Sequence, residues 1–231
     1  MAKPPKSPPP TSPRDSLRGG RGLAVTVRSA GKRSVSSARW LTRQLNDPYV
    51  AAAKQAGWRS RAAFKLLELD ERFHLLHRGQ RVLDLGAAPG GWSQVALRAG
   101  AQVVGLDLLA IEPLKGAVFV QGDMDDPAMP RHLAALLGAP PDLVLSDMAP
   151  NTTGHAATDH LRIVGLAANA AAFAMEVLAP GGAFVCKVFQ GGAEASLLAM
   201  LKQRFATVRH AKPPASRKAS AELYVVAQGF R

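Results

Sequence analysis

Short apolar runs alternate with amphipathic stretches along most of this chain. Five of the apolar runs have the length and composition of buried strands: residues 81–85, 102–107, 117–121, 142–147 and 182–189. The stretches between and after them predict helices near 91–99, 127–137, 158–178 and 193–204. Apolar strands separated by helices indicate a mostly parallel sheet that is covered on both faces.

The end of the chain departs from this alternation. Residues 205–211 and 222–229 are both strand-like, and the sequence between them predicts no helix. They predict a hairpin at the edge of the sheet that contributes one antiparallel strand. The predicted fold class is therefore α/β, with a mostly parallel seven-stranded sheet, an antiparallel edge strand and helices on both faces. Upstream, the pattern predicts short helices over 40–47 and 48–57 and a stronger helix over 60–76.

The N-terminal segment differs from the rest in composition. Residues 1–45 hold three lysines, seven arginines and one acid, Asp15, and so carry +9 of the chain's net charge of +12. A segment so rich in proline and charge cannot bury enough apolar surface to fold alone. We expect a disordered basic arm over 1–38 and one folded domain over 39–231. The arm is interpreted either as a solvated tail without function or as a tether that holds RNA through counterion release.

Charge and cysteine content narrow the class of protein. The sequence pI is about 10.6, which favours a polyanionic partner, nucleic acid first. Cys186 is the single cysteine, so we expect no disulfide framework and a reducing, cytoplasmic compartment, with an organelle transit peptide as a weaker alternative. No run reaches the ~18 apolar residues of a membrane span. No Cys/His cluster has zinc spacing, so no metal site is expected.

A glycine-rich loop follows the first strand. The stretch 82–92 reads VLDLGAAPGGW, in which an apolar run ends at Asp84 and Gly86, Gly90 and Gly91 allow a tight turn and a close approach to a ligand. The spacing matches neither the dinucleotide fingerprint nor the P-loop, and no nucleophile elbow is present. It resembles motif I of methyltransferases that use S-adenosylmethionine.

Acidic residues stand at the ends of four predicted strands: Asp84, Asp107, Asp123 and Asp147. Open α/β sheets bind ligands at this edge. An acid at Asp107 can bind the two hydroxyls of a ribose, and one at Asp123 can accept a hydrogen bond from an adenine amino group. A single Asp at such a place is usually a helix cap, but four of them are harder to explain in that way.

Lys187 interrupts the apolar strand 184–189. An unpaired buried ammonium is costly, so Lys187 is expected to be paired or deprotonated, with Asp147 as its partner. The helix macrodipole disfavours cations at the start of the predicted helix 60–76, yet Arg59, Arg61 and Lys65 lie there. This misfit indicates a functional role for them, although ordinary solvated charges remain an alternative.

Taken together, these blocks closely resemble the FtsJ/RlmE family, whose members are S-adenosylmethionine-dependent ribosomal RNA 2′-O-methyltransferases with a Rossmann-like fold. The resemblance covers about residues 40–231, and its carriers are 60–66, 84–94, 107–109, 121–123, 146–151, 179–182, 187–191, 216–217 and 222–224. It implies a catalytic tetrad of Lys65, Asp147, Lys187 and Glu222. It also implies cofactor contacts through Gly90, Trp92, Asp107, Asp123 and Asp147.

The family further implies a uridine of 23S ribosomal RNA as substrate, in the assembled 50S subunit, and we expect a monomer. Lys187 is interpreted as the base that removes the 2′-hydroxyl proton, or alternatively as a cation that orients this hydroxyl. The RNA surface is expected to include Arg59, Arg61, Lys65 and the basic stretch 202–218. Alternative functions are 2′-O-methylation of transfer RNA or messenger caps, a non-enzymatic role in ribosome assembly, and a dinucleotide-dependent oxidoreductase.

Overall fold

The structure is a computed structural model that describes residues 41–42, 44–149, 156–190 and 195–231. The chain divides into two units, residues 1–61 and 62–231. The expected arm of residues 1–38 lies outside the described residues. In the first unit, α3 (Pro48–Gln55) begins as predicted, because the Asp47 carboxylate accepts a hydrogen bond from the Tyr49 amide (3.0 Å) and Pro48 occupies the first turn.

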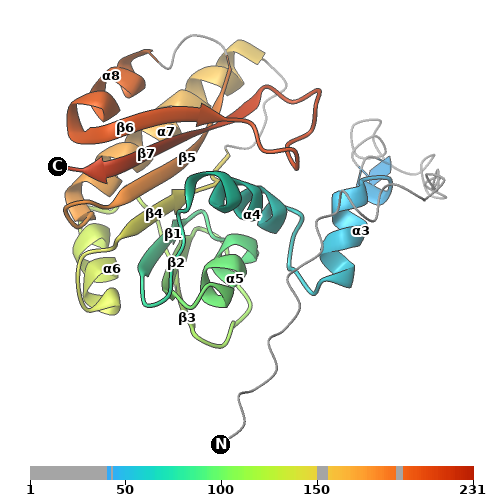
Figure 1. The fold of residues 1–231 in the computed structure, drawn as a ribbon, viewed down its shortest axis with the longest axis horizontal. Helices are drawn as coiled ribbons and strands as arrows, with labels where there is room; N and C mark the ends of the chain where they lie inside the picture. The colour runs from blue at the N-terminus through green and yellow to red at the C-terminus, as the bar shows by residue number, and fades with distance from the viewer. Residues whose placement is uncertain (1–40, 43, 150–155, 191–194) are drawn as a thin grey trace, which may run out of the picture. The chain divides into compact units, whose positions relative to one another are not determined.

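The second unit is a seven-stranded sheet in the order β3-β2-β1-β4-β5-β7-β6 (Figure 1). Its strands are β1 (Arg81–Leu85), β2 (Gln102–Asp107), β3 (Ala117–Gln121), β4 (Leu143–Ser146), β5 (Ala183–Phe189), β6 (Phe205–Ala211) and β7 (Glu222–Phe230). Its helices are α4 (Ala62–Phe73), α5 (Gly91–Arg98), α6 (Met129–Leu137), α7 (Ala156–Val177) and α8 (Ala195–Arg204).

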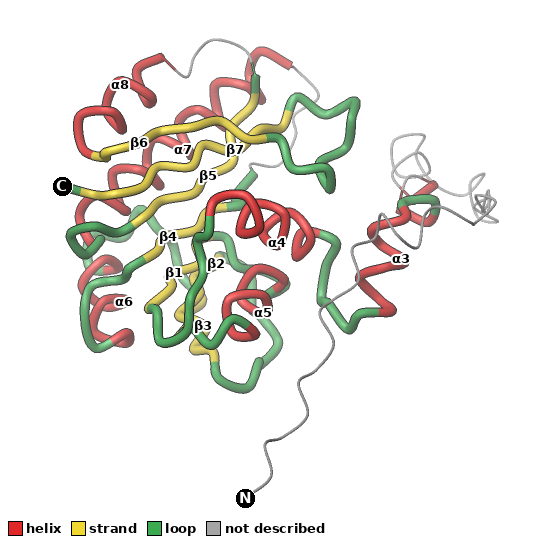
Figure 2. Tube along the Cα trace, in the orientation of Figure 1, coloured by secondary structure: helices red, strands yellow, loops and turns green. Residues whose placement is uncertain are grey.

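The pairing confirms the predicted fold class. Strands β1 to β5 pair in parallel, whereas β7 pairs antiparallel with both β5 and β6. The hairpin of β6 and β7 therefore forms one edge of the sheet, as predicted, and Figure 2 shows β7 lying between β5 and β6. Within the described residues, no helix is both long and apolar enough to span a membrane.

Alternation along the strands divides the core into two layers. Leu83 and Leu85 of β1 belong to one buried cluster with side chains of α6, α7 and α8, such as Leu133 and Leu201. Because successive side chains of a strand point to opposite faces, Asp84 points to the other face, which α4 and α5 cover (Figure 1). The same alternation places Phe184, Cys186 and Val188 of β5 in the first cluster and Lys187 on the face of α4.

Helix α4 is shorter than the predicted 60–76 and ends at Phe73. The next residue, His74, has a φ of +53°, which is outside the helical region. The Asp70 carboxylate accepts hydrogen bonds from the amides of Leu75 (2.8 Å) and Leu76 (2.7 Å). This side-chain interaction competes with continuation of the helix, and apolar periodicity alone does not reveal it.

Candidate active site

The glycine-rich loop lies between the end of β1 and the start of α5. Gly86 and Gly90 have φ values of +72° and +101°, a region that residues with a Cβ rarely adopt. A Cβ at Gly86 would lie 2.3 Å from Cγ of Met148, in the loop after β4. The glycines therefore permit both the turn and the close approach of two loops at the carboxyl edge of the sheet. Gly90 is the N-cap of α5 and has no side chain to cap the helix.

Asp107 ties the loop after β2 to the glycine-rich loop. One carboxylate oxygen accepts a hydrogen bond from the Ala88 amide (2.9 Å) and the other accepts one from the Leu109 amide (2.8 Å). A carboxylate has about four acceptor positions, so Asp107 retains acceptor capacity for ribose hydroxyls. The side chains of Leu108 and Leu109 are both 66% exposed, which places an apolar surface directly beside this carboxylate.

Two other predicted cofactor residues lie in different environments. Asp123 is exposed at the end of β3 and accepts a hydrogen bond from the Asp125 amide (3.0 Å), an arrangement that shapes its own turn. Trp92 is buried, and its indole N–H donates to the Ala62 carbonyl (2.8 Å). The Trp92 ring packs against Tyr224, with 5.6 Å between ring centroids. The indole N–H of Trp92 on α5 therefore links this helix to the start of α4.

Asp84 is a buried carboxyl group beneath the loop. It is 1% exposed, and its Oδ2 accepts a hydrogen bond from the Ser93 hydroxyl (2.7 Å). Burial raises the pKa of Asp84 to about 7, because the hydrogen bonds from Ser93 only partly offset the loss of solvent and the nearby Asp147 opposes ionisation. Ser93 went unassigned in the sequence, although its position at the start of α5 two residues after Gly91 suits it to reach back to β1.

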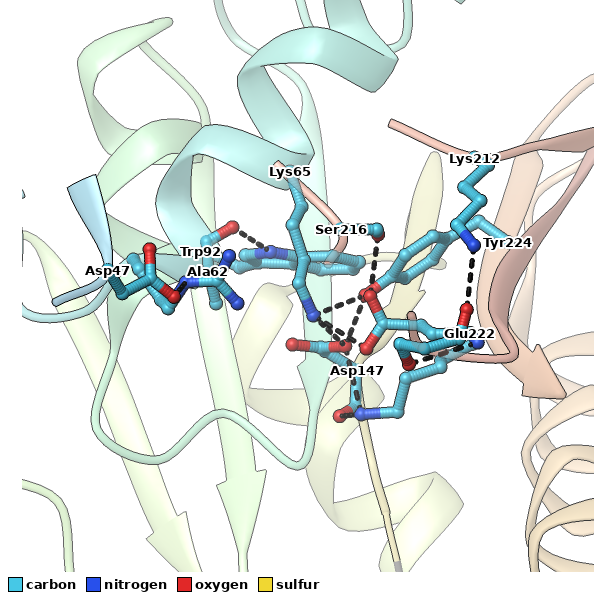
Figure 3. A network of polar contacts seen from close by, with 12 residues as sticks. Asp47, Ala62, Lys65, Trp92, Asp147, Lys212, Ser216, Glu222 and Tyr224 are labelled. Carbon is cyan, nitrogen blue, oxygen red and sulfur yellow. Dashed lines mark hydrogen bonds and ion pairs between the residues drawn. The ribbon is translucent and has the colours of Figure 1, made fainter. Parts of the chain in front are cut away.

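The structure brings together all four residues of the expected tetrad, and Figure 3 labels three of them, Lys65, Asp147 and Glu222. Asp147 follows β4 next to Ser146, which pairs with Cys186, so Lys187 on β5 lies beside it. The Lys187 ammonium donates to Oδ1 of Asp147 (3.0 Å) and to the Asp147 main-chain carbonyl. From α4, Lys65 donates to Oε2 of Glu222 (2.9 Å) and lies 3.7 Å from Oδ1 of Asp147.

Tyr224 joins the two halves of this network. Its hydroxyl donates to Oδ1 of Asp147 (2.6 Å) and accepts from Lys65 (3.0 Å) (Figure 3). Tyr224 pairs directly with Lys187 across β5 and β7, and Glu222 lies two residues earlier on the same face. Tyr224 was not predicted as a site residue from the sequence. The sequence does place Tyr224 two residues after Glu222, on the same face of a predicted apolar strand, and a buried phenol hydroxyl needs a hydrogen-bond partner.

Charges in the network are balanced and largely removed from solvent. Two lysines face two carboxylates, and each of the four side chains is less than one-fifth exposed. Burial by itself raises the pKa of Asp147, but Lys187, Lys65 and the Tyr224 hydroxyl outweigh it and hold this pKa below its usual value. Asp147 is therefore ionised at neutral pH and anchors both lysine side chains.

Basic side chains gather along the chain from α8 to the β6–β7 loop, as expected for a surface that meets a polyanion. Five of them are exposed, namely Lys202, Arg204, Arg209, Lys212 and Lys218, and Arg217 is half-buried. Arg59 and Arg61, in the first unit, are half-buried, and Arg61 forms an ion pair with Asp47 (3.0 Å). Across the described residues, no group of three or more histidine, cysteine or acidic side chains could hold a metal ion.

Known proteins similar to this chain share both its sequence and its fold. Ribosomal RNA large subunit methyltransferase E of Granulibacter bethesdensis is 64% identical over 227 residues, covering 98% of this chain and 96% of that protein. The protein of the same name from Acidiphilium cryptum is 64% identical, covering 91% of this chain and 94% of its own length. A crystal structure described as a ribosomal RNA methyltransferase from Plasmodium falciparum has a TM-score of 0.68 and 30% identity, covering 75% of this chain and 98% of that one.

The fold extends to more distant proteins. A Streptococcus thermophilus protein described as a hemolysin has a TM-score of 0.58 at 16% identity, covering 75% of this chain and 67% of that one, and supports the fold alone. The profile of the FtsJ-like methyltransferase family matches residues 58–230. The resemblance seen in the sequence is confirmed, and the chain belongs to the FtsJ-like methyltransferase family.

Proposed function

We propose that this chain transfers a methyl group from S-adenosylmethionine to a ribose 2′-oxygen of large-subunit ribosomal RNA, at a uridine of 23S RNA in the assembled 50S subunit. The names of its relatives support the ribosomal substrate. The proposed chemistry rests on the environment of Lys187. Its side chain is buried and donates hydrogen bonds to two oxygens of Asp147, at the edge of the sheet where the glycine-rich loop also lies.

The residues around this loop fit S-adenosylmethionine. Gly86 and Gly90 bring backbone rather than side chains to the sheet edge, and the N-terminus of α5 offers positive partial charge to the cofactor's carboxylate. Asp107 suits the ribose hydroxyls, and the exposed Leu108 and Leu109 suit the apolar face of an adenine. Gly90, Trp92, Asp107, Asp123 and Asp147 remain the proposed cofactor residues. When bound, the cofactor supplies a methyl group already activated by its sulfonium.

The lysines have different roles in this proposal. Lys65 donates hydrogen bonds to Glu222 and Tyr224, and its ammonium also lies 3.7 Å from Oδ1 of Asp147, so its charge is held among three oxygens of the protein. Lys187 donates two hydrogen bonds, both to Asp147, which leaves one tetrahedral position of its nitrogen for a substrate hydroxyl. We assign Lys187 as the general base: in its neutral form, with both N–H bonds donated to Asp147, its lone pair would accept the 2′-hydroxyl proton, while Lys65 and Glu222 hold the network and the ribose in place.

The basic residues from α8 to the β6–β7 loop form the RNA surface of the second unit in this proposal, and Arg59 and Arg61 are the proposed RNA contacts of the first unit. Contacts of this kind act on phosphates and release counterions, so affinity should fall steeply as salt rises. An affinity for RNA that is insensitive to salt would contradict this part of the proposal. Ribosomal RNA as substrate also implies action in the cytoplasm and a place in ribosome biogenesis.

The test is methyl transfer from labelled S-adenosylmethionine to large ribosomal subunits that lack the modification, with naked 23S RNA and transfer RNA in parallel. We expect one 2′-O-methyluridine, mapped by nuclease digestion and mass spectrometry, and formed in subunits. Label in transfer RNA alone would move the substrate to that class. Cofactor binding without transfer to any RNA would indicate a non-enzymatic role in assembly. Membership of a methyltransferase family argues against the oxidoreductase alternative.

A further inference from the structure

The loop between β6 and β7, residues 212–221, is attached to the protein at several points. The amide of Ala215 donates to Oε2 of Glu68 on α4 (2.6 Å). The hydroxyl of Ser216 donates to Oε1 of Glu222 (2.6 Å). Within the loop, Lys212 donates to the main-chain carbonyls of Ser220 (2.6 Å) and Lys218 (3.3 Å). The loop thus carries exposed basic side chains, such as Lys212 and Lys218, and is attached to α4 and β7 through part-buried hydrogen bonds.

These anchors close a ring of hydrogen bonds through the tetrad. Glu68 and Lys65 are three residues apart on α4 and project from the same side of the helix. Lys65 binds one oxygen of the Glu222 carboxylate, and Ser216 binds the other. The amide of the adjacent residue, Ala215, donates a hydrogen bond to Glu68 on α4, which closes the ring. Helix α4 therefore holds Glu222 directly through Lys65 and indirectly through the loop.

We propose that Ser216 is a positioning residue for Glu222, and that Glu68 sets the place of Ser216 by holding the loop against α4. A carboxylate bound at one oxygen can still rotate about its side-chain bonds, whereas binding of both oxygens defines its plane. Ser216 is 4% exposed, so water cannot readily replace its hydroxyl. Glu222 in turn orients Lys65, and through it the Tyr224 hydroxyl and Asp147, and Asp147 holds Lys187.

The same segment carries part of the proposed RNA surface. Arg217 and Lys218 immediately follow Ser216, so phosphate contacts at these side chains act on the segment that positions Glu222. RNA bound at Arg217 would therefore act on the adjacent Ser216, and through Ser216 on the position of Glu222. This inference rests on the proposed function, because it assigns Ser216 a role in the same reaction.

A double-mutant cycle tests the proposal. Loss of a hydrogen bond to a charged group predicts that Ser216→Ala lowers kcat about 10- to 100-fold, with little change in KM for RNA. In a Glu222→Ala background, the same substitution should lower kcat less than about twofold, because it acts through Glu222. Ser196→Ala, the same change on the exposed first turn of α8, should behave as wild type. An unchanged kcat in Ser216→Ala, or an equal loss in both backgrounds, would overturn the proposal.

A second cycle uses equilibrium unfolding and needs no activity. Ser216→Ala should lower the unfolding midpoint of the wild-type chain and leave the Glu222→Ala variant nearly unchanged. Equal shifts in both backgrounds would show that Ser216 does not act through Glu222. If the wild type methylated no RNA, the proposed function and the catalytic role of Ser216 would both fail, while this cycle would still decide whether Ser216 orients Glu222.

Discussion

Replacement of Lys187 by alanine is the most direct test of the proposed chemistry. The change removes the amine, together with its two hydrogen bonds to Asp147. General-base catalysis contributes about 10²- to 10⁴-fold to a rate, so kcat should fall by that factor. Cofactor affinity should stay near the wild-type value, because most of the proposed cofactor residues come from the ends of β1, β2 and β3.

The structure also indicates how much stability this variant loses. Removing one partner of a buried ion pair typically costs about 3–5 kcal/mol, because the other charge is left uncompensated. Here Asp147 keeps the Tyr224 hydroxyl at 2.6 Å and Lys65 at 3.7 Å. We therefore expect a loss below that range and a folded variant. Thermal unfolding would confirm this before any rate is measured.

The assay is single-turnover methyl transfer with saturating cofactor, which isolates the chemical step. Small primary amines should restore part of the rate in Lys187→Ala, because the cavity left by the side chain admits an external base. Lys187→Arg should be as slow as the alanine variant, since a guanidinium retains its proton. Lys115→Ala, at an exposed position after β2, serves as the matched control.

Two results would refute the assignment of Lys187 as base. Near-normal turnover in Lys187→Ala would remove it from the chemistry altogether. Substantial activity in Lys187→Arg, with no rescue of the alanine variant by amines, would show that a cation at this position only orients the hydroxyl.

Three further predictions concern other parts of the site. Tyr224→Phe removes the hydroxyl shared by Lys65 and Asp147 but keeps the ring, so kcat should fall by about tenfold. Because this hydroxyl helps to lower the pKa of Asp147, its loss should raise that pKa and move the acid limb of the pH–rate profile to higher pH. An unchanged profile would contradict the role of the hydroxyl. Gly86→Ala should destabilise the protein by more than the ~1–2 kcal/mol expected for a positive φ alone, and Gly138→Ala, where φ is +74° and no atom lies within 4 Å of an added Cβ, measures that reference value in the same denaturant titration. Asp84 has a folded-state pKa raised to about 7 from 3.8, so the unfolded chain releases this proton first and stability falls as pH rises from about 4 to 7, by on the order of 4 kcal/mol. Asp84→Asn should lose this component of the pH dependence, and equal unfolding curves for variant and wild type at every pH would refute the shift.

The order and type of the elements in the second unit follow from the sequence alone. Strands 81–85, 102–107 and 117–121 were predicted with the bounds that the structure shows, because an apolar run enclosed by glycine or polar residues leaves little freedom in where a buried strand can begin or end. Lys187 was identifiable as a special residue for the same reason, since a lone charge in a buried strand demands a partner. The members and roles of the tetrad, by contrast, came from the family resemblance. Without it, Lys65 was only one of three cations at the start of a predicted helix, and Glu222 would not have stood out.

The pairing of Lys187 with Asp147 was predicted and is confirmed, but only the tertiary structure decided the other contacts between side chains. Lys65 and Glu222 are 157 residues apart, and their contact depends on α4 covering the face of the sheet to which β7 directs Glu222. Strand β7 lies between β5 and β6, and this order sets Tyr224 opposite Lys187. Glu68 acquires its role through a hydrogen bond from the Ala215 amide, 147 residues away, whereas Ser216 and Ser93 bond residues of the neighbouring element, six and nine positions away. The periodicity of apolar residues shows which face of a helix or strand a side chain occupies. Hydrogen bonds between elements depend on how those elements pack, so the periodicity could not reveal them.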